Sequence, residues 1–124
     1  MEKYEKGFNK KSFSLYYNGG EIWAEGLDSL EDRKDLVIEK FKEDLKTISK
    51  PSTSSFIALN LDETVVTDDI IKLILDSFVN LGKPLKKVAF VGLSSKYKRY
   101  IKSQSLPFQA ICFDDYEKAK EWLV

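Results

Sequence analysis

The side chains most able to do chemistry gather in segment 62–69, directly after an apolar run. The segment holds carboxylates and two hydroxyl groups, those of Thr64 and Thr67. Carboxylates at the end of a buried strand can bind magnesium, and a hydroxyl group can accept a phosphate. Catalysis would need a further base or nucleophile, but the chain has no histidine and a single cysteine. Because no catalytic set is complete, the sequence predicts that the protein is not an enzyme.

A second charged segment, Lys96 to Lys102, interleaves cations with tyrosines. Such a composition occurs where proteins hold phosphates and stack on bases. On a helix, however, Tyr97, Tyr100 and Ile101 would share one face, so we expect that face to pack on a sheet and the cations to be solvated. The chain has 20 basic and 20 acidic side chains, so no overall field attracts nucleic acid. The sequence therefore predicts no nucleic-acid binding.

The composition predicts one compact domain. The chain has 124 residues, of which 43% are hydrophobic, and this suits a single core. Residues 1–11 are charged and lack periodicity, so we expect an N-terminal arm followed by one domain over residues 12–124. No apolar run approaches the ~20 residues that cross a bilayer, and no secretory signal begins the chain. With one cysteine, Cys112, the sequence predicts a cytoplasmic protein with no membrane contact.

An antiparallel hairpin is predicted at the start of the domain. Apolar residues alternate on both sides of the turn Asn18-Gly19-Gly20. Ile22 and Ala24 would face one way and Trp23 the other, so both faces of the second strand need cover. The N-terminal arm or another copy of the chain could supply it, and the sequence therefore allows a homodimer through this hairpin.

Helices and buried strands are predicted to alternate after the hairpin. Apolar runs over 56–61, 88–93 and 108–113 have the length of central strands. Helical periodicity follows the hairpin and each of these runs. The predicted N-terminal caps of the four helices are Asp28 with Glu31, Thr67, Ser94 or Ser95, and Asp114 with Glu117. The resulting order, β-β-α-β-α-β-α-β-α, predicts an α/β fold with a mixed, mostly parallel five-stranded sheet.

This order of elements resembles the STAS domain, the fold of bacterial anti-sigma factor antagonists and of the cytoplasmic tails of sulfate transporters. The resemblance covers most of the chain. Its pieces are the opening hairpin, the acidic segment Leu59 to Asp69 before a helix, the run Phe90 to Ser95, and the closing segment Phe113 to Ala119.

In the antagonists, an aspartate followed by a phosphorylatable serine begins the second helix. The resemblance places Asp68 on that aspartate and Asp69 on the serine, while isoleucine replaces the glycine of the family pattern. An aspartate cannot accept phosphate from a serine kinase, so we expect no standard serine phosphorylation. If the alignment slips by a residue or two, Thr67 or Thr64 becomes the hydroxyl of interest.

The resemblance implies a regulatory domain that binds another protein and has no cofactor. The partner would be an anti-sigma-type kinase or a sensor complex. The partner-binding residues expected by analogy are Asp62, Thr64, Thr67, Asp68, Asp69, Lys72, Asp76, Ser94 and Ser95, with Asn80 beside them on the second helix.

Other functions remain open on the sequence alone. A lipid or nucleotide could bind between the sheet and a helix, in a cavity lined by Phe41, Phe56, Phe78 and Trp122. The run Asn60 to Thr64 is similar to the nucleophile loop of haloacid-dehalogenase-type phosphatases, but Asn60 stands where the nucleophilic aspartate is needed. A receiver domain is also of this size, but it lacks an opening hairpin.

Overall fold

The computed structural model describes residues 12–124, so the predicted arm over residues 1–11 lies outside the described residues. The elements follow the predicted order, and the described residues form an α/β fold with a mixed five-stranded sheet and four helices. The elements are β1 (Phe13–Tyr17), β2 (Gly20–Gly26), α1 (Lys34–Ile48), β3 (Phe56–Asn60), α2 (Asp68–Val79), β4 (Lys87–Val91), α3 (Ser95–Ser103), β5 (Gln109–Phe113) and α4 (Tyr116–Leu123).

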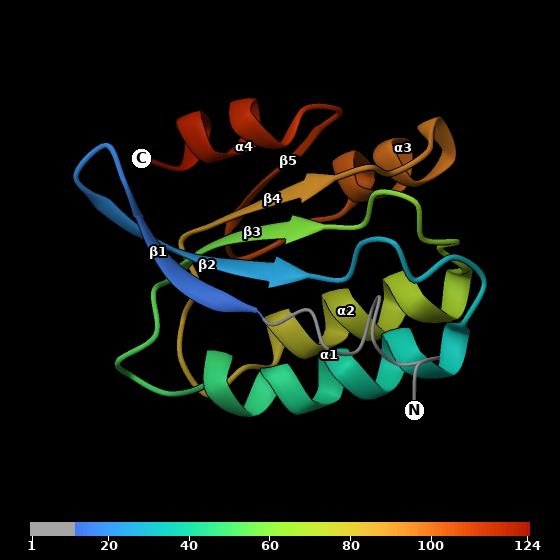
Figure 1. The fold of residues 1–124 in the computed structure, drawn as a ribbon, viewed down its shortest axis with the longest axis horizontal. Helices are drawn as coiled ribbons and strands as arrows, with labels where there is room; N and C mark the ends of the chain where they lie inside the picture. The colour runs from blue at the N-terminus through green and yellow to red at the C-terminus, as the bar shows by residue number, and fades with distance from the viewer. Residues whose placement is uncertain (1–11) are drawn as a thin grey trace.

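The strands lie side by side in chain order, from β1 to β5 (Figure 1). β1 runs antiparallel to β2, and all later neighbours are parallel. The hairpin turn has positive φ angles at Asn18 (50°) and Gly19 (85°), as a type I′ turn requires. Because β2 to β5 are parallel and each is followed by a helix, the loops after them share one edge of the sheet. We call this the carboxyl edge.

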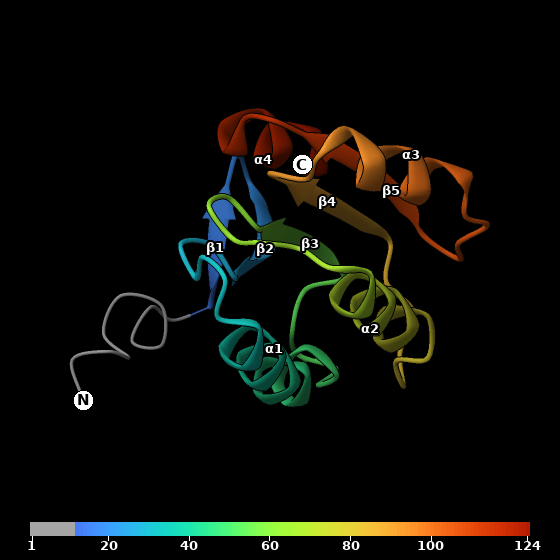
Figure 2. The same ribbon diagram turned by 90° about the vertical axis from the view of Figure 1, so that its right-hand side faces the viewer.

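Helices cover both faces of the sheet (Figure 2). α1, α2 and α3 contribute to one hydrophobic cluster, and α4 contributes to the other. Side chains of the central strands alternate between the two, so Leu59 faces the first cluster and Ala58 the second. Ala58 and Ala89 lie in the cluster with Ala119 of α4, and their small size lets that short helix approach the sheet closely. Within residues 12–124, no helix has the length and apolarity needed to span a bilayer.

Both faces of β2 are covered within the chain. Trp23 is 6% exposed and packs in the cluster of α1 to α3, whereas Ile22 is fully buried in the cluster of α4. The apolar faces of this strand therefore need no second copy of the chain to cover them.

The predicted start of the first helix at Asp28 is wrong. α1 begins at Lys34, and Asp28 is buried in the preceding loop. The backbone of residues 27–31 instead extends the pairing of β2 with β3, with N–H groups of Leu27, Ser29 and Glu31 donating to carbonyls of residues 60–63 at 2.7 to 2.9 Å. Because these donors are already bonded to residues 60–63, and because Ser29 and Glu31 have positive φ angles of 61° and 56°, the spacing of a capping box does not produce a helix here.

The predicted cap of the last helix is displaced by one residue. Asp115, not Asp114, precedes α4, and its carboxylate accepts a hydrogen bond from the Glu117 N–H at 3.0 Å. Asp114 instead pairs with Lys98 of α3, with 2.5 Å between its Oδ1 and the lysine Nζ. Asp115 therefore caps α4, whereas Asp114 forms an ion pair with α3.

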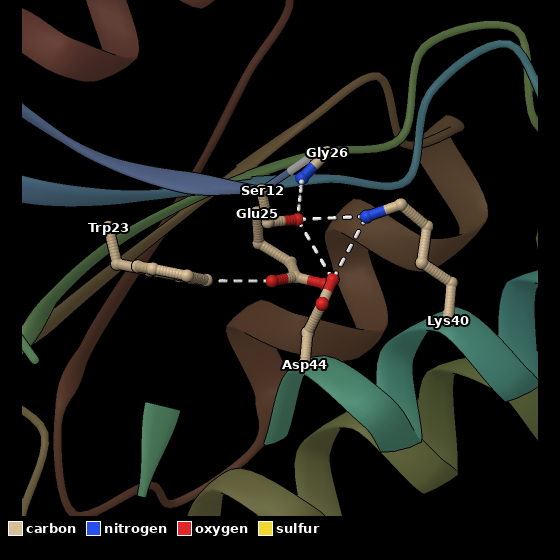
Figure 3. A network of polar contacts seen from close by, with 6 residues as sticks. All are labelled: Ser12, Trp23, Glu25, Gly26, Lys40 and Asp44. Atoms are coloured by element: carbon tan, nitrogen blue, oxygen red, sulfur yellow. Dashed lines mark hydrogen bonds and ion pairs between the residues drawn. The ribbon is translucent and has the colours of Figure 1, made fainter. Parts of the chain in front are cut away.

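A network of polar side chains lies between β2 and α1 (Figure 3). Glu25 of β2 is only 1% exposed, and its Oε1 accepts a hydrogen bond of 2.8 Å from the Trp23 indole N–H. Asp44 of α1 accepts from Ser12 Oγ at 2.8 Å and from Lys40 Nζ at 2.9 Å. The network joins the edge of the sheet to the first helix.

The Glu25 and Asp44 carboxyl groups point toward each other (Figure 3). Glu25 Oε2 is buried and meets no N–H or hydroxyl donor among the described residues. Burial, followed by the hydrogen bond with Asp44 and the charge of Asp44, raises the pKa of Glu25 well above its usual range. Burial also acts to raise the pKa of Asp44, but hydrogen bonds from Glu25, Lys40 and Ser12 outweigh it and lower that pKa. These opposite shifts favour the protonated form of Glu25 and the charged form of Asp44.

The stability of the protein should depend on pH through Glu25. The pKa of Glu25 is raised in the folded state. Its contribution to the free energy of unfolding is therefore fully present below about pH 4.3, the usual glutamate pKa, and is lost as pH rises through the folded-state pKa. We expect Glu25→Gln to remove this decline, because the amide N–H of glutamine can donate a hydrogen bond to Asp44 at every pH. Urea unfolding at a series of pH values measures how the free energy of unfolding of each protein depends on pH.

Glu21→Gln is the matched control, because it makes the same change on the same strand at a less buried position. The control should retain the wild-type pH profile. Identical profiles for wild type and Glu25→Gln would contradict the proton assignment.

Candidate functional site

The acidic loop, residues 62–69, is fastened to the loop after β2 by Thr64. The Thr64 hydroxyl donates to the Leu27 carbonyl at 2.6 Å and accepts from the Leu30 N–H at 3.0 Å. The Val65 N–H adds a bond of 2.7 Å to the Glu31 carbonyl. Thr64 is half-buried, and its hydroxyl is engaged in joining two loops of the carboxyl edge.

Asp62, at the start of the acidic loop, lies directly against the turn between β4 and α3. A Cβ atom built on Gly92 would fall 2.5 Å from the Asp62 Oδ1 and 2.7 Å from its backbone nitrogen. Gly92 also has a φ of 91°, which glycine adopts without strain. Close approach of these two loops therefore requires glycine at this position.

The carboxyl edge carries an excess of acidic groups around Asp62. Burial raises the pKa of Asp62, and the negative charges of Asp28, Glu63 and Asp114 raise it further. Within residues 12–124, no group of three or more acidic or cysteine side chains is arranged to hold a metal ion.

Three consecutive side chains at the start of α2 tie it to its surroundings. Thr67 caps α2, and its hydroxyl accepts from the Ile70 N–H at 3.3 Å. Asp68 accepts a hydrogen bond of 2.7 Å from the Tyr97 hydroxyl. Asp69 pairs with Lys34 of α1 at 2.7 Å. The start of α2 is thus connected to both neighbouring helices.

Asp68 is the centre of a small charged cluster with α3. Its Oδ1 also lies 3.3 Å from the Nζ of Lys96. The hydrogen bond from Tyr97, and then that from Lys96, lower the pKa of Asp68. The hydrogen bond with Asp68 in turn raises the pKa of Lys96 and of Tyr97. Asp68 therefore stays charged at any physiological pH.

The remaining predicted residues lie on exposed parts of α2 and at the start of α3. Lys72 and Asp76 follow Asp68 at successive turns of α2, and both are exposed. Asn80 ends the helix by donating its side-chain N–H to the Asp76 carbonyl at 2.9 Å. Ser94 precedes α3 without a capping bond from its side chain, and Ser95 is the first residue of that helix.

A groove of about 550 Å³ runs between α2 and α3, beside the predicted residues. We call it the α2–α3 groove. Its lining residues are Asp68, Ile71, Lys72, Lys96, Tyr97, Arg99, Tyr100 and Ser103.

The structure brings most of the predicted residues together and adds others. Thr64 to Asp69, Lys72 and the Ser94 turn share the carboxyl edge and the adjoining helix ends, whereas Asp76 lies further along α2. Sequence reasoning missed Lys34, because nothing in the spacing of residues shows that α1 lies beside the start of α2. It placed Tyr97 on a packed face, and Tyr97 is indeed 8% exposed, but its bond to Asp68 was not predicted.

Comparison with protein-family models, with curated proteins and with solved structures finds no match to this chain.

Gly92→Ala should destabilise the protein. The substitution forces a side chain into the left-handed region and against the backbone of Asp62, which should cost about 1–3 kcal/mol in free energy of unfolding. Gly82→Ala is the control, because a Cβ atom there meets nothing within 4 Å. Urea unfolding of both variants tests this, and equal stabilities would contradict the close approach.

Alanine substitution at Thr67 and at Ser94 should change the stability of the protein by different amounts. Thr67→Ala removes a capping bond and should lower stability by about 0.5–2 kcal/mol. Ser94→Ala removes no such bond, so it should change stability much less. Thermal and urea unfolding compare the variants, and a larger loss from Ser94→Ala would show that the capping roles are misassigned.

Proposed function

We propose that this chain is a non-catalytic regulatory domain that binds another protein, in the manner of the anti-sigma factor antagonists that it resembles. The binding surface is the acidic loop, the exposed side of α2 with Lys72 and Asp76, and the adjoining turn at Ser94 and Ser95. The partner is an anti-sigma-type kinase or a sensor complex of a bacterial cytoplasm. The order of elements and the position of Asp68 and Asp69 support this proposal.

The observation that carries the proposal is the fixed position of two exposed carboxylates. The Asp68 and Asp69 side chains are 63% and 74% exposed, yet each pairs with a cation of a neighbouring helix. Both stand at the N-terminus of α2, where the helix dipole favours negative charge. Groups that are already ordered lose little conformational entropy on binding, so this surface is preorganised for a partner.

Asp69 gives this surface a permanent negative charge at the position that the resemblance assigns to a phosphorylatable serine. A phosphoserine would carry about 1.5 to 2 negative charges, and aspartate carries one. The chain would therefore bind its partner in one constant state. Regulation would depend on the partner or on the amount of this protein.

The Thr64 hydroxyl and the Cys112 thiol both support a non-catalytic role. The Thr64 hydroxyl both donates and accepts a structural hydrogen bond. Burial raises the pKa of the Cys112 thiol, so it is a poor nucleophile at neutral pH.

The alternative, a lipid or nucleotide module, lacks the cavity that the sequence predicted for it. Phe41 and Phe78 pack edge to face at 5.5 Å within the cluster of α1 to α3. Phe56 and Trp122 pack against the cluster of α4, on the opposite face of the sheet. The four rings therefore do not line a common space.

Asp69→Asn should reduce recovery of the partner in affinity purification from the native cell. The variant removes the exposed charge but keeps the size of the side chain. Mass spectrometry of the tagged bait and its co-purifying proteins measures the effect and reports any phosphate on Thr64 or Thr67. Asp69→Ser, in parallel, should create a substrate for a kinase that co-purifies.

Glu121→Gln is the matched control, since it neutralises an exposed carboxylate on α4, across the sheet. It should leave recovery unchanged. The proposal fails if neither Asp69 variant changes partner recovery or phosphorylation, or if a lipid or nucleotide is recovered in place of a protein.

A further inference from the structure

The α2–α3 groove has a local excess of positive charge that the chain as a whole lacks. Lys72 stands on the α2 side, and Lys96 and Arg99 stand on the α3 side. Asp68 is the one carboxylate of the lining, so the lining has a net charge of +2. The whole chain, by contrast, has a formal net charge of zero.

Two of the three cations are available to a ligand. Lys96 already pairs with Asp68 and lies 5.1 Å from the centre of the Tyr97 ring. Lys72 and Arg99 make no ion pair or side-chain hydrogen bond with the described residues. Both are exposed, so an incoming anion could reach them without breaking an existing pair.

The floor of the groove is apolar. Ile71 is 1% exposed and Tyr97 is 8% exposed, and Tyr100 packs partly buried against the same hydrophobic cluster. A ligand would therefore place apolar atoms on the floor and negative charge beside the cations on the walls.

We propose that the α2–α3 groove binds an acidic segment of a partner protein, which places an apolar side chain on the floor and carboxylates beside Lys72 and Arg99. This inference rests on the proposed function, because it names the chemistry of the partner. Tyr100, through its partly buried ring, would contact the apolar anchor.

A protein segment fits this groove better than a nucleic acid does. Nucleic acid binding is driven by many cations along a backbone, whereas this groove has two unpaired ones within a neutral chain. The Asp68 carboxylate at its end would repel phosphates. A peptide can combine an apolar anchor with carboxylates and can also offer a neutral or basic residue near Asp68.

The test is a selection from a library of random peptides displayed on phage, with the full chain immobilised. Wild-type protein should enrich peptides in which Asp and Glu flank an aromatic or aliphatic residue. The double variant Lys72→Glu with Arg99→Glu should not enrich them. Fluorescence anisotropy of the best wild-type peptide should give a Kd about tenfold higher for the double variant.

Lys102→Glu is the matched control, because it reverses a charge on α3 outside the groove. It should bind the selected peptide as wild type does. Circular dichroism and urea unfolding verify that each variant is folded. Enrichment of neutral or basic peptides, no enrichment, equal binding by the double variant, or tighter binding of a single-stranded DNA oligonucleotide would overturn the inference.

The two proposals can fail separately. If peptide selection fails while a cellular partner is still lost on Asp69→Asn, the groove inference is wrong and the proposed function stands. If acidic peptides bind in the groove but no protein co-purifies from cells, the proposed function alone is wrong.

Discussion

The parallel arrangement of β2 to β5 determines where the charged side chains of the candidate site lie. Each parallel strand must return by a crossover helix, so every strand ends, and every following helix begins, at the same edge of the sheet. Acidic residues of the loops that precede the helices are thereby gathered in one place, although Asp28 and Asp114 lie 86 positions apart in the chain. Their mutual repulsion is relieved by cations of α1 and α3, which pair with Asp69, Asp68 and Asp114.

Two short-range constraints hold this edge together. Thr64 bonds to the loop before α1, and Gly92 lets the loop before α3 lie against Asp62. Contacts with backbone atoms therefore hold the acidic loop on two sides, independently of its ion pairs. Surface ion pairs alone would fix it poorly, since each contributes about 1 kcal/mol or less. The ion pairs instead orient the exposed carboxylates on a loop that is already positioned.

Sequence patterns predicted the elements well and the contacts between them poorly. Alternation and helical periodicity are properties of one segment, so the order of strands and helices follows from them. A capping pattern is a weaker predictor of structure, because the capping side chain competes with other acceptors for the same backbone N–H groups. After Asp28, carbonyl groups of the loop after β3 accept from those donors, and beside Asp114 the next carboxylate supplies the cap. Glu25 is a charged residue type that is rarely buried, and its 1% exposure follows from how the elements pack around β2. The groove cations were predicted as a solvated face, but their position opposite Lys72 depends on how α3 sits beside α2.

The raised pKa of Glu25 also affects the net charge of the folded chain. At a pH between the unfolded-state and folded-state pKa values of Glu25, the folded protein keeps a proton on this group and carries one more positive unit than the unfolded chain. Unfolding in that pH range exposes the carboxyl group, which then ionises in water. The folded and unfolded forms would then migrate differently in an electric field. Heat measured on unfolding would include the buffer's own enthalpy of taking up a proton, and it would change with the choice of buffer at constant pH.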